Sequence, residues 1–109
     1  MAVPTKAQFV GALREVPKPG GRQRLFLRAH VRARRGLTAR RLAQAARYQN
    51  HGGINLQYGL LAQRIGAALH RRDAHLSLLV EFRRPNSDAE WVLVMHPQFA
   101  AALKEAGWV

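Results

Sequence analysis

The chain has 109 residues, of which 48% are hydrophobic, a length that fits a single domain over residues 1–109 with one modest core. It contains no cysteine, which excludes disulfides and thiolate zinc sites, and no apolar run approaches the roughly 18 residues of a membrane-spanning helix. Its formal net charge of +12 favours polyanionic partners, and we expect a cytoplasmic protein because the first residues lack the apolar segment of a signal peptide.

The first third of the chain predicts two helices. Apolar residues recur at three- and four-residue steps over residues 4–16, which indicates a helix, and the prolines and glycines of residues 17–21 cannot continue it. Over residues 23–33 a second helix is expected, with an inner side that holds Leu25, Phe26, Ala29 and Val31. Its other side carries a cationic stripe at helical spacing, formed by Arg24, Arg28, Arg32 and Arg35.

The middle of the chain predicts a helix-turn-helix pair. Gly36 ends the second helix, and Thr38 is a suitable N-cap for a third helix over residues 38–48. The residues of this helix expected to face inward are Leu42, Ala45 and Ala46, and those expected to face outward include Arg40, Arg41 and Arg47. A loop over residues 49–53 then leads to a fourth helix over residues 54–69, whose small residues Gly59, Ala62 and Gly66 would let another helix approach.

The periodicity changes after this helix. Residues 76–84 and 90–96 alternate or run apolar and are separated by turn residues, which predicts an antiparallel hairpin. A short helix over residues 97–106 follows, and Gly107 ends it. Helices, a helix-turn-helix pair and then a hairpin predict an α+β fold of the winged-helix type, with the hairpin as the wing and a short C-terminal helix.

Positive charge is concentrated in one interval. Between Glu15 and Asp73 there is no acidic residue, while the same interval holds Lys18 and twelve arginines. An alternative explanation is a basic surface that reflects genome composition, but this does not account for the missing acids. We therefore expect the arginines to contact DNA phosphates, which position a protein on the duplex without specifying a sequence.

The first turns of the fourth helix contain more polar residues than a helix of the core needs. Gly52 and Gly53 allow the backbone to come near a phosphate, and the amides of Asn55 and Gln57 can pair with adenine edges. Gln57 and Arg64 are the favoured groove contacts, whereas Asn55 is balanced between a base contact and a structural role as a helix cap or a brace of the preceding loop. Tyr58 is favoured as a core residue over a base contact, because it lies on the apolar face.

A pattern over these residues matches a known family. Residues 38–50 follow T-A-x-x-L-A-x-A-x-x-Y-x-N, and residues 55–61 follow N-L-Q-Y-G-x-L. With its closing segment, the chain from residue 25 to 109 resembles a small domain found at the N-terminus of bacterial HNH endonucleases and as stand-alone proteins. The resemblance implies a DNA-recognition module of a restriction system that senses modified cytosine for an attached nuclease. His51 departs from the pattern, since an aromatic residue is common there.

Catalysis by this chain is not expected. An HNH site needs a histidine base, a metal-binding His or Asp and an asparagine around a divalent ion, and the pair Asn50-His51 suggests one only superficially. No carboxylate lies within twenty residues of His51, and the five histidines lack metal-ligand spacing. We expect no metal and no cofactor.

The prediction is a module that contacts double-stranded DNA through Arg24, Arg28, Arg32, Arg40, Arg41, Arg47, Asn50, His51, Gly53, Asn55, Gln57, Arg64, Arg83 and Arg84. For Arg83 and Arg84 two roles are equally favoured: they lie free at the tip of the wing, or they contact the DNA backbone. Trp91 and Trp108 are expected in the core. An alternative is a protein adaptor that docks a nuclease or a second copy through Leu56 and Leu60, which could equally pack under the hairpin. RNA binding ranks lower, because the aromatics of a stacking sheet are missing.

Overall fold

A computed structural model describes residues 3–49, 52–72, 74–87 and 89–109. The chain forms helices and an antiparallel sheet, which confirms the α+β class. The predicted helices are present, although the third ends earlier than predicted and the fourth begins earlier. In chain order the elements are α1 (Lys6–Glu15), α2 (Gly21–Arg32), β1 (Leu37–Thr38), α3 (Ala39–Ala45), α4 (Gly52–Ala68), the 3-10 helix η1 (Leu76–Leu78), β2 (Val80–Arg83), β3 (Val92–Met95) and α5 (Pro97–Glu105).

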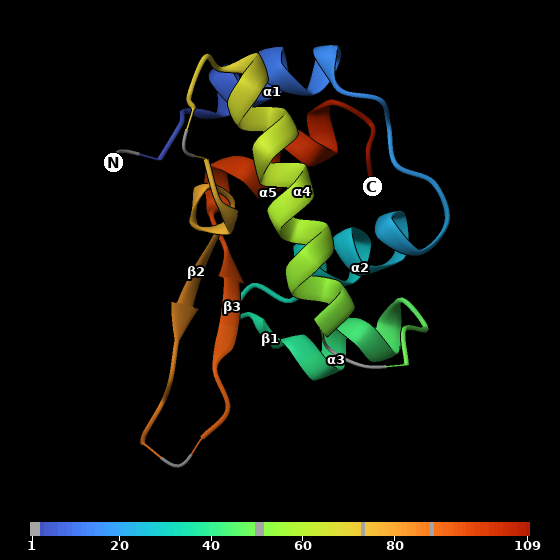
Figure 1. The fold of residues 1–109 in the computed structure, drawn as a ribbon, viewed down its shortest axis with the longest axis vertical. Helices are drawn as coiled ribbons and strands as arrows, with labels where there is room; N and C mark the ends of the chain where they lie inside the picture. The colour runs from blue at the N-terminus through green and yellow to red at the C-terminus, as the bar shows by residue number, and fades with distance from the viewer. Residues whose placement is uncertain (1–2, 50–51, 73, 88) are drawn as a thin grey trace.

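The sheet has three antiparallel strands in the order β1-β3-β2. β1 was not predicted, because its two residues are too few to show alternation. The first part of the predicted strand over residues 76–84 is instead η1, since Leu78, Leu79 and Val80 are all buried and a strand covered on one face cannot bury consecutive residues. Figure 1 shows β2 and β3 extending away from the helices, so the hairpin loop lies at one end of the molecule and α1 at the other.

Threonine caps begin two helices. The Thr5 hydroxyl accepts a hydrogen bond from the Gln8 backbone N–H at 3.1 Å, and the Gln8 side chain accepts one from the Thr5 N–H at 2.9 Å, which forms a capping box. The Thr38 hydroxyl accepts from the Arg41 N–H at 3.2 Å, and this confirms the predicted cap of α3. Because Thr38 also belongs to β1, α3 starts directly at the sheet.

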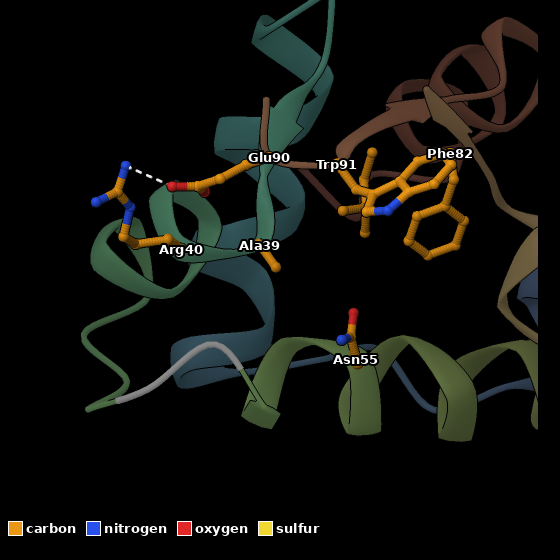
Figure 2. A pocket seen from close by; sticks show the side chains of 7 residues that line it. Ala39, Arg40, Asn55, Phe82, Glu90 and Trp91 are labelled. Carbon is orange, nitrogen blue, oxygen red and sulfur yellow. Dashed lines mark ion pairs between the residues drawn. The ribbon is translucent and has the colours of Figure 1, made fainter. Parts of the chain in front are cut away.

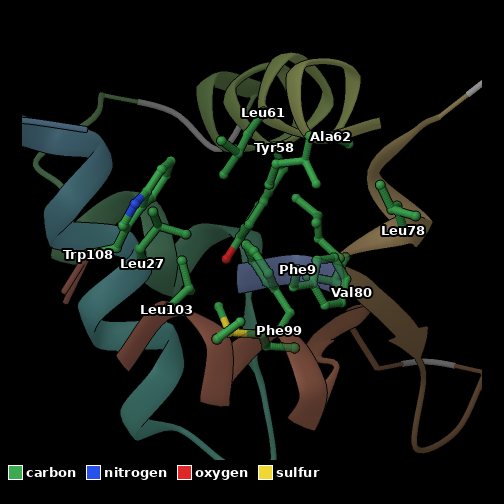
Figure 3. Close-up of a cluster of buried hydrophobic side chains, with 14 of the residues drawn as sticks. Phe9, Leu27, Tyr58, Leu61, Ala62, Leu78, Val80, Phe99, Leu103 and Trp108 are labelled. Carbon is green, nitrogen blue, oxygen red and sulfur yellow. The ribbon is translucent and has the colours of Figure 1, made fainter. Parts of the chain in front are cut away.

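The core lies between the helices and one face of the sheet (Figure 3). The rings of Phe9 on α1 and Phe99 on α5 pack with centroids 5.0 Å apart. Tyr58 on α4 is fully buried, so its predicted core position is confirmed. Trp108 is buried as predicted, and its backbone N–H donates to the carbonyl oxygen of Leu103 at 2.9 Å, which returns the chain to the core after α5.

Three predictions about small or apolar residues are wrong. Leu25 is 40% exposed, because the inner side of α2 is turned toward Phe26, Leu27 and Val31. Ala45 is exposed, and Ala43 is buried in its place. The nearest neighbour of Gly66 is not a helix but the segment that follows α4, because a Cβ on Gly66 would overlap the Cβ of Ala74.

One histidine links three elements inside the core. The Nδ1 atom of His30 on α2 lies 2.5 Å from the Tyr58 hydroxyl, and its Nε2 atom lies 2.6 Å from the Leu93 carbonyl oxygen on β3. A carbonyl oxygen can only accept, so Nε2 carries the proton and the Tyr58 hydroxyl donates to Nδ1. Burial lowers the pKa of His30 and raises the pKa of Tyr58 well above its usual value, so the bridge is neutral at neutral pH.

This histidine predicts a loss of stability in mild acid. The folded pKa of His30 lies below its ordinary value of 6.5, so in that window the unfolded chain binds a proton that the folded chain does not. The contribution of His30 to the free energy of unfolding therefore has its full value above pH 6.5. It decreases as the pH falls toward the folded pKa of His30. Denaturant unfolding of the wild type and of His30→Gln at several pH values measures this; the same pH dependence in both proteins would contradict it.

Candidate nucleic-acid interface

Five arginines gather beside the hairpin, and we refer to them as the hairpin arginine surface: Arg35, Arg40, Arg41, Arg83 and Arg84. One hollow of 430 Å³ is lined by Arg35, Arg83 and Arg84. A second hollow, of 370 Å³, is lined by Arg40 and Arg41. Both hollows include Pro85 and Val92, so they adjoin and form one cationic surface.

The turn at Gly36 brings the two arginine-bearing segments together. Gly36 has a φ of +94°, and a Cβ on it would lie 2.6 Å from the carbonyl oxygen of Leu93. Only a glycine allows this approach, after which Leu37 pairs with Leu93 in the sheet. Arg35 before the turn and Arg41 after β1 are thereby placed next to the hairpin.

Three of these arginines have partners on the hairpin. Arg40 pairs with Glu90 at 2.9 Å and Arg83 with Glu81 at 2.8 Å, and all four side chains are more than half exposed. The Arg84 guanidinium lies 4.7 Å from the centroid of the Trp91 ring. Exposed ion pairs contribute roughly 0–1 kcal/mol, so these contacts orient the arginines without committing them. Arg35 and Arg41 form no ion pair with another residue of the described segments.

A third hollow, of different character, opens between α4 and the inner face of the hairpin. This aromatic pocket has a volume of 680 Å³ and is lined by Ala39, Arg40, Asn55, Phe82, Glu90, Trp91 and Leu93. Figure 2 shows Asn55 pointing from α4 toward the space bordered by Ala39, Trp91 and Phe82. Phe82 is 40% exposed and Trp91 is 51% exposed.

The predicted core position of Trp91 is therefore wrong. Trp91 precedes Leu93 and Met95, which alternate toward the core as the sequence pattern predicts. The hairpin is longer than the helical layer that covers it, so the same face that is buried at Leu93 is open at Trp91. The alternation of apolar residues predicts correctly which face of the sheet Trp91 lies on. It does not show how far along the strand the helices cover that face.

The other predicted arginines lie elsewhere. Arg24, Arg28 and Arg32 are exposed on α2, and neither hollow beside the hairpin includes them. Arg47 is exposed in the turn after α3. Arg64 lines a hollow with Glu15 near the end of α1. Of the arginines predicted to contact DNA, the structure brings together Arg40, Arg41, Arg83 and Arg84, and it adds Arg35, which had been placed only in the stripe on α2.

The start of α4 differs in part from the prediction. Gly52 and Gly53 belong to the first turn of the helix rather than to the preceding loop, and a Cβ on Gly53 would lie 3.3 Å from the Tyr48 ring. Close packing against Tyr48 gives a structural reason for Gly53, and the predicted approach of its backbone to phosphate stays a prediction. Gln57 is half-buried and not on an exposed flank, while Asn55 is exposed. The predicted contacts Asn50 and His51 lie outside the described residues.

Two further observations bear on the kind of site. Within the described ranges, no group of three or more His, Asp or Glu side chains is placed to hold a metal ion. No helix there has both the length and the apolar character needed to span a bilayer.

Comparisons of the chain with protein-family models, with curated proteins and with solved structures found no match. The resemblance to the HNH-associated domain therefore stays a prediction.

Proposed function

We propose that the chain is a duplex DNA-binding module of the winged-helix type, in which the hairpin is the wing. The observation that carries this proposal is the hairpin arginine surface, where two segments distant in sequence contribute five exposed arginines. The helix-turn-helix pair α3–α4, followed by a hairpin whose inner strand also pairs with β1, is compatible with such an arrangement.

The charge distribution supports a polyanionic ligand. Arginine matches phosphate geometry through its planar fork of N–H donors, and its charge persists at any physiological pH. The protein carries a net charge of +12, so the field around it draws in a polyanion before contact is made. Contacts of this kind position the duplex and leave sequence discrimination to other groups.

Binding should depend steeply on salt. If all five arginines of the surface neutralise phosphates, log K plotted against log salt concentration falls with a slope of about −4.5, since each contact contributes about −0.9. Raising the salt from 50 to 200 mM then weakens binding about 500-fold. Fluorescence anisotropy with a labelled duplex measures this slope; binding that does not change with salt, or no binding at low salt, would overturn the proposal.

The finer proposal, that the module senses modified cytosine for an attached nuclease, is supported by the resemblance of residues 38–61 to the HNH-associated domain. It predicts that a duplex with 5-methylcytosine binds more tightly than the same unmodified duplex. Equal affinities would remove this version and leave phosphate binding by the arginines untouched.

A protein-docking function is favoured by one observation. Leu56 is 61% exposed and Leu60 is 39% exposed on α4, so neither packs under the hairpin. Exposed leucines one helical turn apart can seat a partner helix or nuclease domain. Replacing both with serine separates the two functions, because it abolishes capture of such a partner and leaves duplex affinity unchanged.

A further inference from the structure

The aromatic pocket is lined by apolar side chains whose exposure to water is energetically unfavourable. Phe82 and Trp91 turn large ring surfaces toward solvent, although two residues further along the same face the strands are buried. Its volume of 680 Å³ lies inside the roughly 300–1,000 Å³ of small-ligand pockets. An occupant with a flat apolar ring would cover these surfaces.

The polar groups of the pocket determine which flat ring can form hydrogen bonds there. Asn55 presents a carboxamide, with both a donor and an acceptor, and this side chain forms no hydrogen bond with another described residue. Arg40 and Glu90 on the rim are paired with each other, so they do not compete for Asn55. A ring that offers a donor beside an acceptor on one edge fits this amide, and nucleobases have such edges.

The pocket opens next to the cationic surface. Arg40 lines both the aromatic pocket and the hollow that holds Arg41. On the hairpin, the Arg84 guanidinium lies against the ring of Trp91 and also lines the hollow with Arg35. A ring bound in the pocket would thus have its attached sugar and phosphates directed to arginines on both sides, which a nucleotide requires and an apolar peptide does not.

We propose that the aromatic pocket holds a single base turned out of the duplex, with the base between Asn55 and the rings of Phe82 and Trp91. This inference rests on the proposed function, because the arginines must first hold the flanking phosphates. Stacking on aromatic side chains and hydrogen bonding to the edge of a base are the contacts by which proteins hold extruded bases. Extrusion requires unpairing, so the affinity depends on how strongly the base was paired.

Three labelled duplexes of equal length test the inference by anisotropy. One is fully paired, one contains a mismatched base, and one has an abasic residue at the mismatched position. The abasic duplex is weakened locally in the same way but offers nothing to insert. We expect the mismatched duplex to bind about tenfold more tightly than either of the others, since unpairing it costs least.

Variants then assign the preference to the pocket. Asn55→Ala and Phe82→Ala are each expected to bring the affinity ratio of mismatched to abasic duplex close to one. Leu56→Ala, next to Asn55 but outside the pocket lining, is the matched control and keeps the ratio of the wild type. Thermal melts establish that each variant is folded.

The outcomes separate the two proposals. Equal binding of all three duplexes by the wild type, with a steep salt dependence, overturns the pocket proposal and leaves the DNA-binding function standing. A preference that survives Asn55→Ala and Phe82→Ala overturns it as well. Absence of binding to every duplex at low salt overturns the proposed function itself, and the pocket proposal with it.

Discussion

Replacing Arg35 and Arg41 together with alanine is expected to weaken duplex binding about 60-fold at 0.1 M salt, from two contacts that each contribute a slope of about −0.9. The slope of log K against log salt becomes less steep by about 2 for the same reason. These two arginines are the best test of the surface, because neither is held by a glutamate of the described chain and neither lines the aromatic pocket. Anisotropy titrations at three salt concentrations give both quantities.

A variant of equal charge provides the control. Arg14 and Arg64 are exposed and lie near the α1 end of the molecule, opposite the hairpin loop (Figure 1). Replacing both with alanine removes the same two charges, so the long-range attraction is reduced equally and any difference reports local contact. If this control loses as much affinity as the Arg35 and Arg41 variant, the surface beside the hairpin is not the interface.

Gly36→Ala is expected to lower the free energy of unfolding by about 3 kcal/mol, which combines a strained backbone with overpacking. The new Cβ would meet the Leu93 carbonyl oxygen at 2.6 Å and the Val92 side chain at 2.7 Å, and the φ of +94° disfavours any residue with a side chain. The backbone oxygen cannot turn away as a flexible side chain would. Differential scanning calorimetry should show a melting temperature lower by roughly 12 °C or more.

Gly59→Ala is the control for the same chemical change. Gly59 lies within α4, and nothing lies within 4 Å of an added Cβ, so alanine meets no obstacle. Alanine is favoured over glycine inside helices, and we expect a gain of about 0.5–1 kcal/mol. Similar effects of the two substitutions would show that β1 does not approach β3 as closely as described.

The helices could be predicted because each one depends on signals within itself. Thr38 caps α3 through a bond to a residue three positions away, and Pro97 begins α5 at the position where a missing N–H costs least. β1 carries no such local signal. Its two residues become a strand only because Gly36 lets them reach β3, which lies more than fifty positions further along the chain.

The site could be predicted by residue type but not by grouping. Helical spacing linked Arg35 with Arg24, Arg28 and Arg32, but Arg35 follows the end of α2 and turns toward the hairpin. The roles of Phe82 and Trp91 depend on how far the hairpin projects beyond the helices, a distance set by tertiary packing. His30 gave no signal in the sequence, because its two partners, Tyr58 and Leu93, are distant in the chain.

Glu90 lies 2.9 Å from the Arg40 guanidinium, so a phosphate that binds this arginine must share it with a carboxylate that repels the phosphate, or displace that carboxylate. Glu81 pairs with Arg83 in the same way, so a phosphate that binds Arg83 also competes with a carboxylate. A small anion that meets one arginine at a time gains little from such an exchange. A duplex bound at Arg35 and Arg41, as we propose, would present its next phosphates at high local concentration and could displace both carboxylates. If the proposed surface binds a duplex, the two glutamates would compete more effectively with isolated anions than with a polymer of regularly spaced phosphates.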